Sequence, residues 1–243
     1  MANRIKGTSG NDVLQGTGAR DRVFALGGND QVWTYGELDT VYGGSGHDTI
    51  EGGKRADYLV GGPGFDVMYG QFGLDTLRAG DGDDLLSAGK HDDAAYGGAG
   101  DDTIRGGTGA DSLYGGKGED TLNGDGGDDV LYGNKGADLM RGAAGFDSLD
   151  GGNGRDTIVG GSGDDVMRGG HGADVFAFTA GDGNDVVEDF ELGIDHIRVR
   201  DTFIQSVSVD DAAREIYVHF ASGETMRLDD IDGRHVTVDD LIA

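Results

Sequence analysis

One apolar residue recurs every nine positions along this chain, from Leu14 to Phe176, in nineteen consecutive units that begin at Gly7 and contain no insertion or deletion. Ala95 is the only small member of the series. The apolar residue and its two neighbours, as in residues 103–105, are typical of a very short strand whose central side chain points to one face. A strict nine-residue period predicts a solenoid in which such strands stack on one another.

The rest of each unit is rich in glycine and predicts a tight turn. The consensus is G-G-x-G-x-D-x-U-x, with U apolar, and residues 43–51 match it at every position. Glycine at positions 1, 2 and 4 allows positive φ and close approach of backbones. Two turn-strand units complete one circuit of eighteen residues. We therefore expect an all-β fold, a right-handed parallel β-roll with two nonapeptides per coil and the U residues between two sheets.

Position 6 is aspartate in all nineteen units, from Asp12 to Asp174. With the glycines, this motif resembles the repeats-in-toxin (RTX) family, and the resemblance covers residues 7–177. It implies a calcium-binding roll in which carbonyls of positions 2 and 4 of one turn, carbonyls of positions 1 and 3 of the next turn on that edge, and both aspartates hold Ca²⁺. Six oxygen ligands suit this hard, flexible cation.

The expected ligands fall into two sets. The aspartates are Asp12, Asp30, Asp48, Asp66, Asp84, Asp102, Asp120, Asp138, Asp156 and Asp174 on the edge formed by odd-numbered units, and Asp111, Asp129, Asp147 and Asp165 on the even edge. The glycines implied as metal ligands through their carbonyls are Gly44, Gly46, Gly62, Gly64, Gly98, Gly100, Gly107, Gly109, Gly116, Gly118, Gly152, Gly154, Gly161 and Gly163.

The amino-acid composition restricts the classes of partner that this chain can bind. Fifty glycines with one proline exclude a collagen-like chain. A net charge of −27 disfavours nucleic acid and anionic membranes and favours multivalent cations. There is no cysteine and no apolar stretch long enough for a transmembrane helix. Stacked aspartates about 5 Å apart repel one another, and Ca²⁺ removes this cost, so we expect a chain that folds only near millimolar calcium.

The two edges differ in sequence. Position 4 is glycine in every odd unit, whereas the four exceptions, Ala19, Glu37, Arg55 and His91, all lie in even units. Basic residues gather nearby: Arg20, Arg22, Lys54, Arg55 and Lys90. One hypothesis is that this part of the even edge has lost its metals and that cationic side chains partly replace them. Neutral drift in turns that still bind is the alternative. The hypothesis leaves about twelve Ca²⁺ sites.

The repeat is expected to end at residue 177, giving a lead-in at 1–6, the roll at 7–177 and a cap at 178–243. Residues 178–190 and 193–197 are similar to the segment that closes the roll of secreted RTX proteases. Strand-like runs follow at 204–209, 215–220 and 224–228. The tail at 239–243 resembles the C-terminal signal of type I exporters, and residues 1–7 lack the apolar core of a Sec signal. We expect a secreted protein that folds after export.

No enzyme is expected. The H-E-x-x-H and G-x-S-x-G motifs are absent, and His47, His91 and His171 fall in turns without partners at ligand spacing. A structural, adhesive or cell-surface role is favoured. The alternative is an accessory module of a larger secreted enzyme, similar to the R modules of alginate epimerases or the tail of an RTX protease.

Aromatic residues recur on one sheet face, at position 9 or 7 of even units. They are Phe24, Tyr42, Tyr58, Tyr96, Tyr114 and Tyr132. Cross-strand packing that stabilises a thin sheet is one interpretation. A surface platform for polysaccharide, formed by the five tyrosines, is the other.

Overall fold

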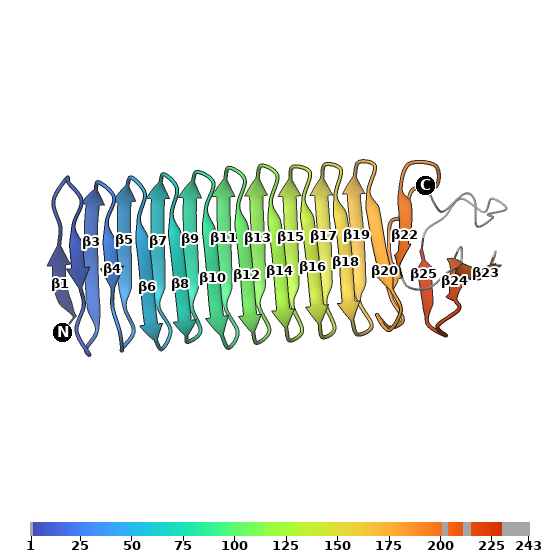
Figure 1. The fold of residues 1–243 in the computed structure, drawn as a ribbon, viewed down its shortest axis with the longest axis horizontal. Coiled ribbons are helices and arrows are strands. Elements are labelled where there is room, and N and C mark those ends of the chain that lie inside the picture. The colour runs from blue at the N-terminus through green and yellow to red at the C-terminus, as the bar shows by residue number, and fades with distance from the viewer. Residues whose placement is uncertain (1, 201–203, 211–214, 230–243) are drawn as a thin grey trace.

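The computed structural model is an elongated solenoid of two parallel sheets, and it describes residues 2–200, 204–210 and 215–229 (Figure 1). Every element of these residues is a strand, turn or bend. The all-β parallel roll expected from the nine-residue period is confirmed. From β1 to β22, successive strands alternate between the sheets, so a strand of the roll pairs with the strand two places along the chain.

The first sheet has 14 strands, in the order β1-β3-β5-β7-β9-β11-β13-β15-β17-β19-β21-β25-β24-β23. Their bounds are β1 Asn3–Lys6, β3 Asp21–Gly27, β5 Thr40–Ser45, β7 Tyr58–Pro63, β9 Thr76–Asp81, β11 Ala94–Ala99, β13 Ser112–Lys117, β15 Val130–Lys135, β17 Ser148–Asn153, β19 Val166–His171, β21 Val186–Val187, β23 Ile204–Asp210, β24 Glu215–Phe220 and β25 Thr225–Leu228.

The second sheet has 11 strands, β2 to β22 in even numbers. Their bounds are β2 Val13–Gln15, β4 Gln31–Trp33, β6 Thr49–Lys54, β8 Val67–Phe72, β10 Leu85–Lys90, β12 Thr103–Thr108, β14 Thr121–Gly126, β16 Leu139–Ala144, β18 Thr157–Ser162, β20 Val175–Thr179 and β22 His196–Arg200.

The register keeps equivalent positions of the repeat in straight rows. Ile104 of β12 lies beside Leu86 of β10 and Leu122 of β14. The U residues from Val23 to Phe176 are at most 1% exposed, and even Ala95 is fully buried. The core is therefore a single layer of side chains between the two sheets. The row starts earlier than expected, because Ile5 of β1 pairs with Val23 and packs against the core.

The C-terminal end of the roll is covered. β22 continues the second sheet, and β25, β24 and β23 continue the first, the last two pairings being antiparallel. Phe190 packs on Phe176, with ring centroids 5.9 Å apart, and Phe220 packs on Phe178 at 5.8 Å. These contacts shield an apolar sheet end that otherwise invites association. The tail at 239–243, expected to be an export signal, lies outside the described residues.

Candidate metal centres

The position-6 aspartates form a ladder along each edge of the roll. The backbone N–H of each aspartate donates to Oδ1 of the aspartate eighteen residues later, as in Asp48 to Asp66 and Asp102 to Asp120, both at 2.8 Å. These carboxylates are almost fully buried. Each aspartate of the ladder, which we call a rung, thus has its carboxylate held by the backbone N–H of the preceding rung.

The second oxygen of nearly every rung has no hydrogen-bond partner. This holds for Oδ2 of seventeen aspartates, namely Asp30, Asp39, Asp48, Asp57, Asp66, Asp75, Asp84, Asp93, Asp102, Asp111, Asp120, Asp129, Asp138, Asp147, Asp156, Asp165 and Asp174. A buried, unpaired carboxylate oxygen is costly, and proteins retain such groups where another partner compensates. A periodic row of them indicates a periodic partner.

Backbone carbonyls of the earlier turn point into each gap between neighbouring turns. A Cβ on Gly62 would lie 1.8 Å from Gly44 O, and a Cβ on Gly64 would lie 1.9 Å from Gly46 O. Only a residue without a side chain fits over these oxygens. All fourteen glycines expected in the sites have φ between +98° and +156°, which glycine adopts readily.

Carbonyls of the later turn point back into the same gap. Gly46 N donates to Pro63 O at 2.9 Å. The space beside Gly43 is bounded by Asp48 Oδ2 and Gly61 O, which lie 2.4 and 2.8 Å from the position of a Cβ there. Positions 1 and 3 of the later turn therefore face positions 2 and 4 of the earlier turn across the carboxylates.

Each intact gap thus brings together two carboxylates and four carbonyls. Among the described residues, no three acidic, His or Cys side chains converge at ligand spacing, so backbone oxygens supply most of the donors. An all-oxygen donor set with two carboxylates fits Ca²⁺. When bound, calcium would supply positive charge to the unpaired Oδ2 atoms. This structural role requires no catalytic chemistry of the ion.

The pKa values express the cost of the ladder without a cation. Burial raises the pKa of Asp57 and of Asp93 to about 8, and neighbouring carboxylates add to the rise although backbone N–H groups oppose it. Asp66 and Asp102 are raised to about 7 and Asp120 to about 6, again mainly by burial. An ionised ladder at neutral pH needs a compensating cation.

The first turn of each edge differs from the others. Asp12 Oδ2 accepts a hydrogen bond from Thr8 N at 2.6 Å, and Asp21 Oδ2 accepts one from Thr17 N at 2.5 Å. Threonine replaces glycine at position 2 in both turns. Asp12, expected to be a ligand, is therefore in the odd ladder but already has a partner for Oδ2.

The gap between the turns of units 4 and 6 is occupied by a side chain. Thr34 is the only position-1 residue larger than alanine, and its buried hydroxyl donates to Gly52 O at 2.6 Å. Gly52 O is a position-1 carbonyl, one of the donors that intact gaps direct at the cation. Thr34 was not among the exceptions recognised in the sequence, although its place at position 1 could have identified it.

Cationic side chains tie together the neighbouring even turns. Arg20 Nε donates to Leu38 O at 3.1 Å, and Arg55 forms an ion pair with Glu37 at 3.6 Å. Arg55 nevertheless keeps positive φ at position 4 (67°). Departure from the intact turn is concentrated at units 2 and 4.

His91 keeps the backbone of an intact turn, but its ring Nδ1 lies 2.6 Å from Lys90 O, a position-3 carbonyl. Its φ is 78°, and its backbone N–H donates to Thr108 O at 2.6 Å, as Gly46 does to Pro63 O. The carbonyl of His91 still lies under Gly109. The backbone of this turn therefore matches the alternative of side-chain drift, although the His91 ring contacts one of its carbonyls.

The even ladder continues into the cap. Asp165 N donates to Asp185 Oδ1 at 3.0 Å, and a Cβ on Gly183 would lie 1.9 Å from Gly163 O. Residues 180–188 read A-G-D-G-N-D-V-V-E, which fits the repeat after a two-residue insertion. Asp185 was missed because the insertion breaks the nine-residue period.

The odd ladder is closed by the cap instead. Asp174 N donates to Asp195 Oδ1 at 2.9 Å, but Asp195 Oδ2 accepts from Glu191 N at 2.8 Å. The carboxylate of Asp189 accepts from Gly169 N and Gly170 N, both at 2.9 Å. The cap therefore provides partners for the N–H groups of Gly169, Gly170 and Asp174, whereas Asp174 Oδ2 remains unpaired.

The expected aromatic platform is a stack of rings. Tyr96, Tyr114 and Tyr132 stack with centroids 4.7 and 5.1 Å apart and planes within 10°, and Arg78 covers the free face of Tyr96 at 4.5 Å. A second stack joins Phe24 and Tyr42. The rings of each stack pack face to face, as the interpretation of cross-strand packing predicts.

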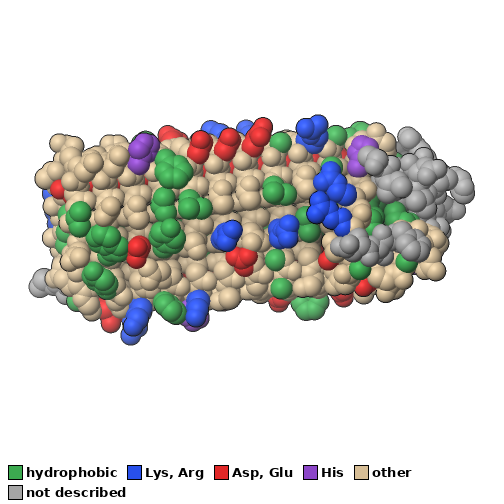
Figure 2. All heavy atoms as spheres, viewed as in Figure 1, with side chains coloured by type: hydrophobic (Ala, Val, Ile, Leu, Met, Phe, Trp, Pro, Cys, Tyr) green, Lys and Arg blue, Asp and Glu red, His purple; other side chains and the backbone are tan. Residues whose placement is uncertain are grey.

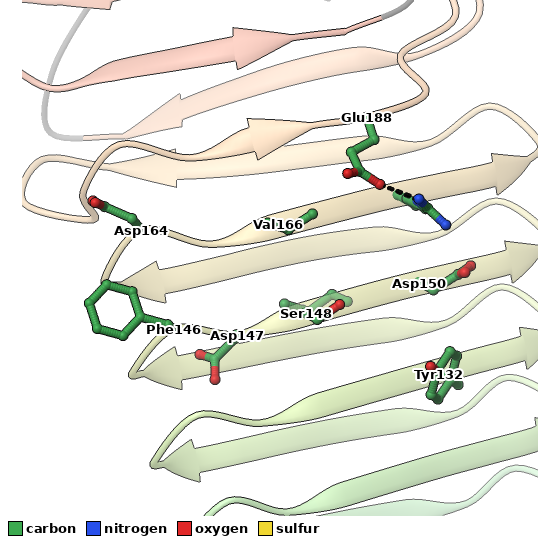
Figure 3. A pocket seen from close by; sticks show the side chains of 10 residues that line it. Tyr132, Phe146, Asp147, Ser148, Asp150, Asp164, Val166 and Glu188 are labelled. Carbon is green, nitrogen blue, oxygen red and sulfur yellow. Dashed lines mark hydrogen bonds and ion pairs between the residues drawn. The ribbon is translucent and has the colours of Figure 1, made fainter.

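Tyr58, on the neighbouring row of β7, is 37% exposed. The long stack ends at Tyr132, which borders a hollow of about 410 Å³ (Figure 3). Asp150 and Arg168 follow Tyr132 in register, and Arg168 pairs with Glu188. Tyr132 therefore lies at the edge of a concave surface.

The fold and ladders define a parallel β-roll of the calcium-binding type. The model of the RTX calcium-binding nonapeptide repeat (4 copies) matches eight segments, which together cover residues 1–187. The chain belongs to this family.

The comparison with solved structures found several proteins that are similar to this chain. A hyperactive, Ca²⁺-dependent, β-helical antifreeze protein from an Antarctic bacterium is 19% identical over 78% of each chain, with a TM-score of 0.49. Extracellular lipase LipA from Serratia marcescens is 17% identical over 87% of this chain and 41% of its own, at 0.31.

The AlgE6R3 subunit of the Azotobacter vinelandii mannuronan C5-epimerase is 27% identical over 52% of this chain and 78% of its own, at 0.22. A search of curated proteins gave no match. No helix of the described residues is long and apolar enough to cross a membrane.

Proposed function

We propose that this chain is an extracellular calcium-binding roll that leaves the cell unfolded through a type I exporter and folds on meeting calcium outside. The observation that carries the proposal is the row of buried, unpaired Oδ2 atoms facing backbone carbonyls. Because the cation must be present for folding, the chain folds only in a compartment that contains enough calcium.

The number of bound Ca²⁺ ions depends on how many gaps between neighbouring turns of one edge keep their oxygen ligands. The sequence pattern favours about twelve. The preserved turn of His91 and the added rung Asp185 support further sites, whereas the Thr34 hydroxyl opposes a site between units 4 and 6. Elemental analysis of calcium per chain after gel filtration tests this count. A stoichiometry of only one or two ions contradicts the proposal.

A role at a cell surface or in a matrix is supported by the hollow beside Tyr132. The half-buried ring of Tyr132 offers a face for a sugar ring, and Asp150, Arg168 and Glu188 beside it offer polar groups for the sugar hydroxyls. We expect Tyr132→Ala to weaken binding to a polysaccharide or cell surface without loss of calcium-induced folding. Tyr114→Ala, inside the stack, is the matched control. Equal effects of both variants would assign the tyrosines to packing alone.

A further inference from the structure

A second hollow lies on the outer face of the second sheet. It is close to the even-edge turns that lack glycine at position 4. It has a volume of about 270 Å³. It opens beside Gly53 of β6, which lies between Tyr35 and Gln71 of the neighbouring coils. Figure 2 shows this face, with hydrophobic and basic side chains together along the lower edge of its N-terminal half.

Aromatic side chains form the apolar wall of this hollow. Trp33 of β4, Tyr35 and Phe72 of β8 line it. Tyr35 is 51% exposed and Phe72 is 44% exposed, so both present ring surface to solvent. Lys90 Nζ lies 4.9 Å from the centroid of Phe72 and fixes that ring. Three aromatic rings around one small depression favour a flat, partly apolar ligand.

Polar groups complete the lining. Glu51 Oε2 accepts a hydrogen bond from Gln71 Nε2 at 2.9 Å, and Lys54 lies in register with Phe72 at the rim. The carboxylate and the amide oxygen are acceptors, and the amide and the ammonium group are donors. One negative and one positive side chain leave the hollow without net charge.

These features point to a single ligand chemistry. The volume is below the roughly 300–1,000 Å³ of sites for drug-sized ligands, so it suits one ring. Aromatic surface next to mixed donors and acceptors suits a ring that has apolar C–H faces and hydroxyl edges. The balanced charge of Glu51 and Lys54, in a chain of net charge −27, disfavours an anionic ring.

We propose that the hollow beside Gly53 binds one hexose unit of a neutral polysaccharide. The ring stacks against Tyr35 and Trp33, and its hydroxyls bond to Glu51, Gln71 and Lys54. The site requires the folded roll of the proposed function, but it shares no residue with the hollow beside Tyr132.

Trp33 provides the assay, because it is the only tryptophan of the chain. The calcium-loaded full chain is titrated with maltohexaose, cellohexaose and a polyuronate while tryptophan emission is recorded. We expect a saturable change in emission with a neutral oligosaccharide and a response at least tenfold weaker with the polyuronate. Far-UV circular dichroism on the same samples reports folding, so an unfolded chain is distinguished from a folded chain that does not bind.

Two variants separate the site from the fold. Tyr35→Asn keeps a residue that tolerates the positive φ of 81°, and Glu51→Ala removes the acceptor from a strand. Each is expected to weaken the emission response to neutral sugar at least tenfold, whereas Leu139→Ala, at a 45% exposed position that lines neither hollow, leaves it unchanged. The proposal is overturned if neutral sugars leave the emission of folded protein unchanged, if both variants bind as the parent does, or if the polyuronate binds more tightly.

Discussion

Removal of calcium should unfold the roll at neutral pH, and mild acid should restore part of its structure. The magnitude follows from the ladders. Burial raises the pKa of Asp120 to about 6 from an ordinary value of 3.8, and two pKa units correspond to about 3 kcal/mol. Three or four ionised rungs therefore match the roughly 5–15 kcal/mol that stabilises a typical domain. Without a cation the ladders cannot remain both buried and charged.

The direction of the pH effect is fixed by the raised pKa values. Between the unfolded pKa near 3.8 and folded values from about 6, as at Asp120, to about 8, as at Asp57, the folded chain binds more protons than the unfolded chain. Stability of the calcium-free roll is therefore greatest at low pH and is lost as the pH rises through this window. Protonation of the ladder aspartates removes their negative charge, so the folded chain no longer needs the cation.

The assay is far-UV circular dichroism of calcium-stripped protein between about pH 4.5 and pH 8, with light scattering to exclude aggregates. We expect a β-sheet spectrum at the acid end, its loss through the window, and its return at neutral pH when millimolar calcium is added. A parallel series in about 1 M salt, where the screening length is about 3 Å, separates general surface repulsion from the buried ladders. A full β spectrum in excess EGTA at neutral pH would refute the reasoning.

Two further substitutions test the site and the core. Thr34→Gly should add one bound Ca²⁺ per chain by elemental analysis, because it frees Gly52 O, while Thr34→Val should add none; no gain with glycine contradicts the assigned block. Leu113→Ala should destabilise the calcium-loaded roll by about 2–5 kcal/mol in denaturant unfolding, because Leu113 is fully buried. The control Leu139→Ala, at a 45% exposed position, should change stability by about 0.5 kcal/mol or less; equal losses would argue against a core of U residues.

The sequence predicted the architecture because the repeat is local. Each strand and turn is encoded within nine residues, and the U residue and the glycines fix which face is buried and where the chain turns. The parallel pairing of equivalent positions, such as Leu86 with Ile104, follows from that period. The calcium family was equally evident, since the aspartate recurs without a gap.

The sequence predicted less well where the chain departs from the period. The two-residue insertion before Asp185 concealed a further rung of the even ladder. Arg55 and His91 differ in sequence from glycine but keep left-handed backbone, so the side chain at position 4 does not by itself predict the backbone conformation of the turn.

Only the tertiary structure decided which atoms meet between coils. Each gap takes its oxygens from residues about eighteen positions apart, and the unpaired state of Oδ2 depends on both turns together. The Thr34 hydroxyl reaches Gly52 O for the same reason. The hollow beside Gly53 joins three neighbouring strands. The nine-residue code specifies the unit, whereas the sites form between units, where side chains from separate coils share one space.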